Sequence, residues 1–402
     1  MNKKTKVLVV TNSFPNRHNK EAAVFILNQL ECLKDYCEFK VVFPYPYIPR
    51  IGYFNPFQKF SDMPFKEKIN GIEVYHPKYL QITRFFLNNK FLLSIAILLQ
   101  SYAIYVASVS VIKKIQKEWN FDIVHIHDPL SSGLLGAYAR ENYNTPLVIT
   151  FHGEDVTKIW KMKVLRAIYR HALRSCDAFV FVSYYLRRVL DVKLPHEKTF
   201  IIPSGYMVGR FKPLSKNKCI EMLNLQKNRK IVLFVGWLVE RKGVEYLIRA
   251  IGIAAKKDGN VICWIVGDGP LMKNLEELAN KLGLNGTINF AGRKSPDEIP
   301  LWMNAADLLV LPSLNEGLPN VVVEALACGK PVVATKVAGT PEIVDKDVGY
   351  LVKPRDPVDL AKKIILALNK KWKKEKLLKR ARQFSVINST NRLLNVYKNL
   401  LG

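Results

Sequence analysis

The stretch that decides the fold occupies residues 312–335 and reads PSLNEGLPNVVVEALACGKPVVAT. The apolar run 308–311 precedes it and predicts a strand, since β-branched and leucine residues follow one another there without a break. A loop comes next, and we expect a helix to begin near Leu318–Pro319, because proline suits the first helical turn. Gly329 is placed to end that helix, and Pro331 lies just beyond it. The segment therefore predicts a strand–loop–helix unit.

The loop and the predicted helix start suit an anionic ligand. Gly317 allows a ligand to approach the backbone closely, and the N–H groups at Gly317, Leu318 and Asn320 lie at the positive end of the helix dipole. Glu324 lies one to two turns inside the helix, within reach of a vicinal diol such as ribose, because a carboxylate accepts both hydroxyl hydrogens. Glu316 lies in the loop, where a sugar attached to the diphosphate would be.

The spacing of the two glutamates excludes one other chemistry. If the intervening segment is mostly helical, eight residues separate the backbones of Glu316 and Glu324 by about 12 Å. The acid and nucleophile of a glycoside hydrolase lie about 5–9.5 Å apart. We therefore do not expect these two carboxylates to form a hydrolase pair.

The same alternation of strands and helices extends along the whole chain. Apolar runs that predict strands lie at 7–10, 40–43, 123–127, 147–151, 178–182 and 200–202, and then at 231–235, 261–266, 287–291, 308–311 and 331–334. Short apolar strands separated by helices are typical of parallel sheets that are covered on both faces. The pattern restarts near residue 231. We therefore predict an α/β chain with domains at 1–203 and 204–387, a hinge within 203–229, and a C-terminal helix at 388–402 that packs back on the first domain.

Charged residues, histidines and glycines follow the predicted strands. In open α/β sheets, ligands bind outside the carboxyl ends of the strands, so these residues are candidates for a site. They lie at 127–128, 152–155, 236–243, 267–270, 292–293 and 313–320. No G-x-G-x-x-G dinucleotide fingerprint follows Val10 or Val235.

The segment around Glu316 and Glu324 resembles the E-x7-E signature of retaining glycosyltransferases of family 4. The resemblance covers most of residues 231–352 and, more loosely, the N-terminal half. It implies the GT-B fold, in which two Rossmann-like domains face each other across a cleft, with the donor bound mostly to the C-terminal domain and the acceptor to the N-terminal one. It also implies that Glu324 binds the nucleotide ribose and that Glu316 lies beside the donor sugar.

Two further loops of the C-terminal half resemble family loops. Residues 236–243, beginning at Gly236, are similar to the G-R-L-x-x-x-K-G loop, whose Arg and Lys hold the diphosphate. Lys242 matches the lysine, but Trp237 occupies the arginine position, and we interpret Arg241 as its substitute. Such cations stabilise charge that builds on a departing diphosphate. The resemblance further assigns Gly267, in a G-x-G-P turn, and Gly292 and Arg293 to donor binding.

The N-terminal half resembles the family in two places. Residues 150–155 are similar to an H-G-x-D stretch whose histidine contacts the donor sugar, so His152 is a candidate for that role. Ala23 lies where the first family loop has glycine. His125 and His127 share one face of a predicted strand, yet no third metal ligand is evident nearby, and the family generally needs no metal. We predict no metal site and no cofactor besides a nucleotide-sugar co-substrate, UDP- or GDP-linked.

Charge and hydropathy bear on the partners. The formal net charge is +27, spread over both halves, which favours anionic partners; a lysine-rich solvated surface would give the same number. The charge-free stretch 91–112 is long enough to span a bilayer. It fits a helix of the first domain, a helix that rests on a membrane surface, or a spanning helix. Basic residues recur at helical spacing over 158–174, which fits docking on an anionic leaflet.

The six cysteines form no C-x-x-C pair, which suits free thiols in a reducing cytosol. We expect a cytoplasmic enzyme, peripheral on the inner face of the membrane, that moves a hexose from a nucleoside diphosphate sugar to a glycan or lipid-linked hydroxyl in polysaccharide or glycolipid biosynthesis. The alternatives are a nucleotide-sugar epimerase of the same fold, a non-catalytic nucleic-acid binder suggested by charge alone, and a transferase made inactive by Trp237 and Ala23. No nucleic-acid partner is expected.

Overall fold

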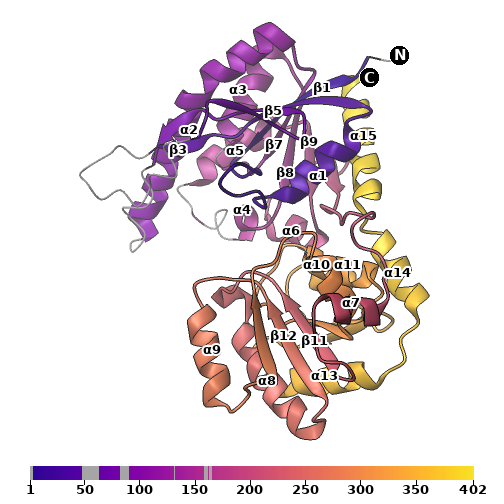
Figure 1. The fold of residues 1–402 in the computed structure, drawn as a ribbon. Helices are drawn as coiled ribbons and strands as arrows, with labels where there is room; N and C mark the ends of the chain where they lie inside the picture. The colour runs from indigo at the N-terminus through magenta and orange to yellow at the C-terminus, as the bar shows by residue number, and fades with distance from the viewer. Residues whose placement is uncertain (1–2, 48–62, 82–89, 131, 158–161, 163–164) are drawn as a thin grey trace. The chain divides into compact units, whose positions relative to one another are not determined.

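The computed structural model describes residues 3–47, 63–81, 90–130, 132–157, 162 and 165–402. The chain divides into two compact units (Figure 1), one made of Met1–Pro203 with Ser389–Gly402 and the other of Ser204–Asn388. The limits expected from the sequence were residues 203 and 387. Each unit is an α/β sandwich with its own sheet.

The first unit is built on an eight-stranded sheet with the order β10-β9-β8-β7-β1-β2-β5-β4. All neighbours pair in parallel except β4 and β5. Its strands are β1 (Thr5–Thr11), β2 (Cys37–Val42), β4 (Lys66–Ile69), β5 (Ile72–Tyr75), β7 (Ile123–His127), β8 (Leu147–Phe151), β9 (Ala178–Phe181) and β10 (Thr199–Ile201). A small parallel pair joins β3 (Tyr45–Tyr47) to β6 (Lys78–Leu80). The chain order reverses between β1 and β7, where ligands of such sheets bind.

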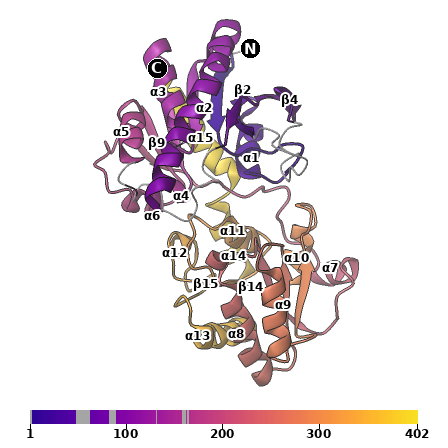
Figure 2. The same ribbon diagram turned by 90° about the vertical axis from the view of Figure 1, so that its left-hand side faces the viewer.

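Helices cover both faces of this sheet. They are α1 (Val24–Leu33), α2 (Lys90–Trp119), α3 (Gly133–Tyr143), α4 (Glu154–Thr157), α5 (Arg166–Arg174), α6 (Tyr184–Val189) and α15 (Val386–Leu401). Apolar side chains of α1 and α15, including Leu30 and Tyr397, share one core cluster with Val7 and Val41 of the strands. The C-terminal helix thus packs on the first unit, within which Figure 1 shows α15 beside α1. On the other face α2 packs on α3 and α3 on α5 (Figure 2).

The second unit has a six-stranded, entirely parallel sheet with the order β13-β12-β11-β14-β15-β16. Its strands are β11 (Lys230–Val235), β12 (Val261–Val266), β13 (Ile288–Gly292), β14 (Leu308–Leu311), β15 (Val332–Thr335) and β16 (Gly349–Val352). Numbered within the unit, this is the order 3-2-1-4-5-6 of dinucleotide-binding folds. The chain order reverses between β11 and β14, so the loops after these two strands are where a ligand is expected.

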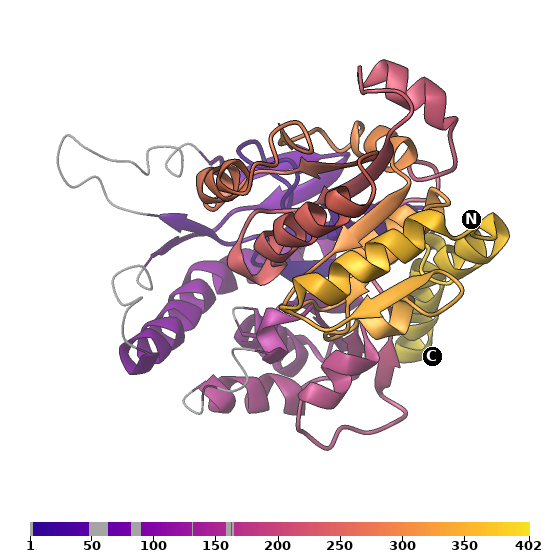
Figure 3. The ribbon, with the colours of Figure 1, turned by 90° about the horizontal axis from the view of Figure 1, so that it is seen from below.

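The helices of the second unit are α7 (Lys216–Met222), α8 (Val244–Lys257), α9 (Met272–Lys281), α10 (Ile299–Ala305), α11 (Asn320–Ala327), α12 (Thr340–Ile343), α13 (Pro357–Asn369) and α14 (Lys374–Arg382), with a 3-10 turn at Glu240–Lys242. Figure 3 shows α8 and α13 side by side, and they pack on each other. Strand residues such as Leu233 and Leu309 are almost completely buried, as continuous apolar strands covered on both faces require.

Candidate functional site

Two loops meet at the point where the strand order of the second unit reverses. The 3-10 turn at Glu240–Lys242 follows β11, and the Nζ of Lys242 lies 2.6 Å from the Oε1 of Glu316 in the loop after β14. The Nη1 of Arg241 lies 3.7 Å from Oε2 of the same carboxylate. Ser313 completes the group, since its hydroxyl donates to Glu316 Oε1 at 2.7 Å. The carboxylate therefore holds two cations at the carboxyl end of the sheet.

The members of this group differ in exposure. The side chains of Glu316 and Lys242 are 8% and 13% exposed, whereas that of Arg241 is 45% exposed. Backbone contacts fix the two loops against each other, because Leu314 N–H donates to the Arg241 carbonyl at 2.7 Å. A Cβ on Gly243 would lie 2.3 Å from the Pro312 carbonyl oxygen, so only glycine allows this approach. These contacts hold the two loops against each other, and Arg241 is the more exposed of the two cations.

Helix α11 begins beside this group, at Asn320, with Pro319 as its N-cap in an extended conformation. No side chain caps the helix start by a hydrogen bond. The first-turn N–H groups and the helix dipole therefore favour an anion there. The expected start near Leu318–Pro319 is confirmed to within a residue or two, and Gly329, with a φ of +74°, lies just past the end of the helix.

Glu324 lies in the second turn of α11 and is partly buried. Burial raises the pKa of its carboxyl to about 7, although the positive charge of Arg210 acts in the opposite direction. The structure thus holds a carboxyl group in surroundings that disfavour its charged form. A ligand that donates two hydroxyl hydrogens would favour the carboxylate again.

The glycine turn after β12 supports the loop after β11. A Cβ on Gly267 would lie 1.9 Å from the Gly236 carbonyl oxygen, and one on Gly269 would lie 2.5 Å from that of Leu238. Leu238 N–H also donates to the Asp268 carbonyl at 2.8 Å. These contacts explain the G-x-G-P sequence by packing of one loop on the next. The Gly292 carbonyl accepts a hydrogen bond from Gly267 N–H at 2.9 Å, which joins the end of β13 to the loop after β12.

Three histidines lie together at the carboxyl ends of β7 and β8 in the first unit, of which His125 and His127 are buried and His152 is partly buried. His127 Nδ1 lies 2.9 Å from His152 Nε2, and the two rings are stacked with centroids 5.2 Å apart. The ring of Phe25 lies 4.9 Å from that of His152. The His125 ring lies 4.3 Å from the His127 ring. The sequence placed His125 and His127 on one face, and the fold adds His152 to them.

Hydrogen bonds fix His125 within this group. The Oη of Tyr397 in α15 lies 2.6 Å from its Nδ1, and the Thr150 hydroxyl lies 2.7 Å from its Nε2. Burial lowers the pKa of His125 to about 3 and that of His152 to about 4, and it lowers the pKa of His127 well below the ordinary value. All three imidazoles are therefore neutral at pH 7. No group of three or more His, Cys, Asp or Glu suited to a metal ion occurs among the described residues.

The residues at the strand reversal of the first unit are also joined. The side-chain amide of Asn12, after β1, donates to the Asp128 carboxylate, after β7. Ala23, at the N-cap of α1, has φ 45° and ψ 38°, which is the left-handed conformation that glycine adopts without strain. The sequence identified this position as one where the family has glycine, and the backbone here has the conformation that favours glycine.

Comparison with known proteins gives the family. The model of Glycosyltransferase Family 4 matches residues 90–209, and that of Glycosyl transferases group 1 matches residues 215–384. An uncharacterized glycosyltransferase of Methanocaldococcus jannaschii is 33% identical over 274 residues, which is 68% of this chain and 73% of that protein. The chain belongs to glycosyltransferase family 4.

Two more relatives of this family 4 glycosyltransferase are informative. The GDP-mannose-dependent α-(1-6)-phosphatidylinositol monomannoside mannosyltransferase of Mycolicibacterium smegmatis is 30% identical over 256 residues, which is 61% of this chain and 66% of that protein. The structure of Anabaena HepE in complex with UDP superposes with a TM-score of 0.72 at 19% identity and covers 98% of this chain and 100% of that one. The predicted GT-B fold is thereby confirmed.

The structure brings most of the predicted donor-site residues of the glycosyltransferase to one edge of the second sheet. Glu316, Lys242 and Arg241 contact one another, and Gly317, Leu318 and Asn320 lie in the loop that leads into α11. Arg241 and Lys242 both lie at the Glu316 carboxylate. Trp237, at the position of the family arginine, is 52% exposed.

Sequence reasoning missed two contributors to this edge, Thr335 and Gly339, and gave Ser313 no role beyond its position after a strand. Ser313 orients Glu316, and the hydroxyl of Thr335, the last residue of β15, donates to the Ser313 carbonyl. Gly339 lies against the Gly317 loop, because its Cβ would be 2.2 Å from the Gly317 carbonyl oxygen. The turn 336–339 also follows a strand, so the strand-end rule applied elsewhere in the chain would have found it. The contacts of His127 with His152 and of Tyr397 with His125 were not predicted.

The structure describes only part of the basic helix that was predicted over residues 158–174. Positions 158, 161 and 163 lie outside the described residues, and α5 covers Arg166–Arg174. The apolar side chains of Tyr169, Ala172 and Leu173 in this helix are buried in the first unit. These three side chains therefore cannot enter a bilayer, whereas Arg170 and Arg174 are exposed and available to a partner.

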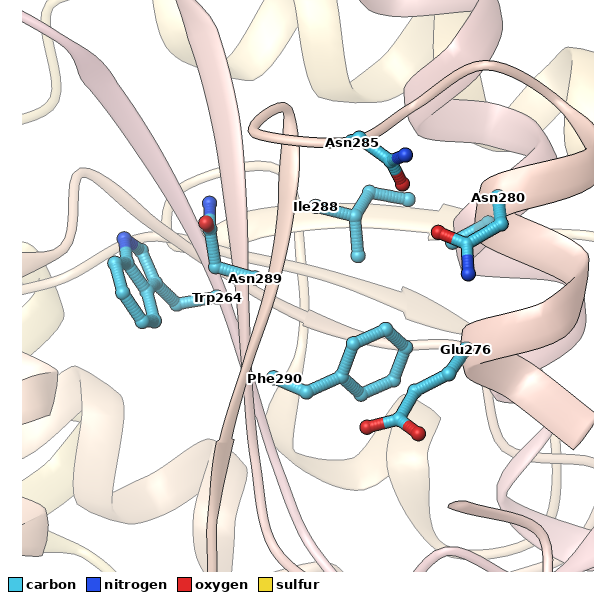
Figure 4. Close-up of a pocket in the computed structure, with 8 residues that line it drawn as sticks. Trp264, Glu276, Asn280, Asn285, Ile288, Asn289 and Phe290 are labelled. Carbon is cyan, nitrogen blue, oxygen red and sulfur yellow. The ribbon is translucent and has the colours of Figure 1, made fainter. Parts of the chain in front are cut away.

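A separate pocket of about 430 Å³ lies along β13 and α9 (Figure 4). Figure 4 shows the side chains of Phe290 and Glu276 beside each other in it. Asn285 and Ile288, which also line it, lie at the start of β13, whereas Gly292 lies at its end. None of the predicted site residues lines this pocket, so it is distinct from the candidate donor site.

Proposed function

We propose that this glycosyltransferase moves a hexose, with retention of its anomeric configuration, from a nucleoside diphosphate sugar to a hydroxyl of a glycan or lipid-linked acceptor. The observation that carries the proposal is the group of Lys242, Arg241 and Glu316 beside the uncapped start of α11. Two cations and free N–H groups at a strand reversal are what a diphosphate requires. The names of the relatives support UDP or GDP as the nucleotide, since one binds UDP and another depends on GDP-mannose.

The roles follow from the positions of the residues and from the family. Lys242 and Arg241 bind the diphosphate with the α11 start at Asn320, while Glu324 accepts the ribose hydroxyls. Glu316 orients the two cations and lies beside the sugar. Gly236, Gly267 and Gly292 shape the loops around the nucleotide, with Arg293 at their edge. His152, in the first unit, contacts the donor sugar.

The reaction that we propose is attack of the acceptor hydroxyl on the same face from which the diphosphate leaves. The bond from the anomeric carbon to the phosphate oxygen breaks as the bond to the acceptor oxygen forms. The departing phosphate takes the proton of the acceptor hydroxyl, and the cations of the loop after β11 stabilise its charge. We further propose that no divalent metal takes part, so that transfer continues in excess EDTA. An inverted anomer in the product would contradict this mechanism.

We also propose that the enzyme lies in the cytoplasm against an anionic membrane surface, where it meets a lipid-linked acceptor. Helix α2 has the length and composition of a spanning helix, and only a third of its apolar stretch is buried in the protein. Leu99, Tyr102 and Val106 are at least half exposed and lie on one face at helical spacing. The opposite face, including Ile104 and Ile112, is buried, which favours a helix that rests on the membrane over one that spans it.

The charges near α2 support the same surface. The basic residues Lys113, Lys114 and Lys117 are exposed on its C-terminal part, and the basic face of α5 belongs to the same layer of helices. An apolar stripe with cations around it is complementary to an anionic leaflet. The free cysteines, of which Cys37 and Cys176 are buried, fit a reducing compartment.

The decisive experiment for the donor is thermal unfolding with UDP, GDP and ADP and their common sugars. A ligand well above its Kd stabilises the folded protein by a few kcal/mol. We expect one nucleotide family to stabilise the wild type and to lose its effect in Glu324→Ala. Glu277→Ala, an exposed glutamate on α9, is the matched control and should behave as the wild type. If no nucleotide stabilises the protein, the proposed function fails.

A further inference from the structure

The proton shared by His127 and His152 can be assigned from the structure. Their Nδ1 and Nε2 atoms lie 2.9 Å apart, which is a hydrogen bond and therefore holds one proton. Burial keeps both rings neutral at pH 7, since it lowers the pKa of each. A neutral imidazole carries a single N–H, so one ring donates in this hydrogen bond and the other accepts.

The second nitrogen of His127 decides which ring donates. Its Nε2 is buried and has no hydrogen-bond partner among the described residues. If the proton were on Nε2, a buried N–H would be unpaired, and buried donors without partners are rarer than incompletely paired acceptors. The proton therefore lies on Nδ1 of His127 and is donated to Nε2 of His152. His152 must then carry its own proton on Nδ1.

The rings around this pair keep the arrangement in place. His125 lies against His127 and is itself held by the hydroxyls of Tyr397 and Thr150. Phe25 and His127 contact the His152 ring, so that its orientation is restricted. The C-terminal helix α15 thus contributes to the histidine group through Tyr397.

We propose that His127 is a positioning residue of the glycosyltransferase, whose Nδ1–H holds His152 in the tautomer that presents Nδ1–H as its hydrogen-bond donor. The ability of His152 to donate a hydrogen bond from Nδ1 matters because a hydroxyl oxygen of the sugar accepts such a hydrogen bond. This inference rests on the proposed function, in which His152 contacts the donor sugar. It adds a residue that acts through His152 and does not itself touch the sugar.

Two amide variants separate a tautomer effect from a packing effect. The side-chain nitrogen of asparagine lies where His127 has Nδ1, whereas that of glutamine lies where it has Nε2. We expect His127→Asn to retain kcat within a few fold. His127→Gln should lose about tenfold to a hundredfold in kcat, by analogy with the outer partners that orient a metal-binding imidazole. Equal loss in both variants would mean a structural role and overturn the proposal.

Nitrogen NMR of histidine-labelled protein reads the tautomer directly, and the chain has only seven histidines to assign. We expect the Nδ1 of His152 to be protonated and its Nε2 to be bare in the wild type and in His127→Asn, with mixed tautomers in His127→Gln. A protonated Nε2 in the wild type overturns the proposal. A failure of the proposed function would instead appear in the thermal unfolding experiment, in which no nucleotide would stabilise the wild-type protein.

Discussion

Lys242 Nζ lies 2.6 Å from Glu316 Oε1, and this pair joins the loop after β11 to the loop after β14. Both side chains are largely buried, so each charge depends on the other for its stabilisation. The pair occupies the strand reversal of the sheet, where a diphosphate would add further negative charge. Glu316 thus holds Lys242 and Arg241 in place at this strand reversal.

Replacement of one partner of this pair should destabilise the protein. Breaking a buried ion pair costs about 3–5 kcal/mol; Arg241 and Ser313 still contact Glu316, so we expect about 2 kcal/mol for Lys242→Ala. The free energy of unfolding in urea measures this. Lys227→Ala, which breaks the exposed pair with Glu221, is the control and should cost less than about 1 kcal/mol. Equal losses of unfolding free energy in the two variants would contradict the view that burial strengthens the Lys242–Glu316 pair.

Glu324→Gln should stabilise the protein at high pH and hardly change it in acid. The folded state raises the pKa of Glu324 from 4.5 to about 7, so it binds the proton more tightly than the unfolded state. Stability is therefore lost as pH rises from 4.5 through 7 and stays lower above it. We expect Glu324→Gln to gain up to about 3 kcal/mol at pH 8 and almost nothing at pH 4.5. A gain in the free energy of unfolding that does not change with pH would refute the raised pKa of Glu324. Nucleotide binding should weaken in the same variant.

Ala23→Gly should stabilise the first unit. Ala23 has a left-handed conformation that costs an alanine about 1–2 kcal/mol, while glycine adopts it freely but loses more entropy on folding. We expect a gain of up to about 1 kcal/mol in the free energy of unfolding. Ala255→Gly, inside α8, is the control and should lose about 0.5–1 kcal/mol. A loss at both positions would show that the Ala23 conformation is not strained.

The two units should respond oppositely to acid between pH 6.5 and 4.5. The unfolded state binds protons on His125 and His152 of the first unit more readily than the folded state, since folding lowers the pKa of His152 to about 4 and of His125 to about 3. The first unit therefore loses stability as pH falls through this window, by about 2 kcal/mol for each such histidine at pH 5. The second unit gains stability there through Glu324. Hydrogen exchange read by mass spectrometry at pH 7 and pH 5 resolves the units, and parallel changes in both would contradict the prediction.

The exposed face of α2 should bind anionic vesicles. Leu99→Asn with Val106→Asn removes two half-exposed apolar side chains, and each contributes about 1–2 kcal/mol when buried in lipid. We expect the partition coefficient to fall by at least about tenfold, measured by co-sedimentation with vesicles that contain phosphatidylglycerol. Leu366→Asn, an equally exposed leucine on α13, is the control. Binding of the wild type that equals binding of the double variant would count against a membrane surface on α2.

Much of the strand pattern could be predicted from the sequence. The strands at 123–127, 147–151, 261–266 and 308–311 have the predicted bounds, because each is a continuous apolar run covered on both faces. Strands β3, β4, β5, β6 and β16 were not predicted. They have only three or four residues, and β4 (Lys66–Ile69) consists largely of charged residues at the sheet edge, so no apolar periodicity marks it.

The sequence by itself determined the α/β fold, the family and the edge of each sheet where the candidate site residues lie, because hydrophobic runs and strand-end residues are local signals. Only the tertiary structure decided which groups act on one another. Lys242 and Glu316 are 74 positions apart, and Tyr397 and His125 are 272 apart, yet parallel strand order and the return of α15 place them in contact. Such contacts, and the burial that sets the pKa values of Glu324 and His152, depend on the packing of whole layers and leave no pattern in the local sequence.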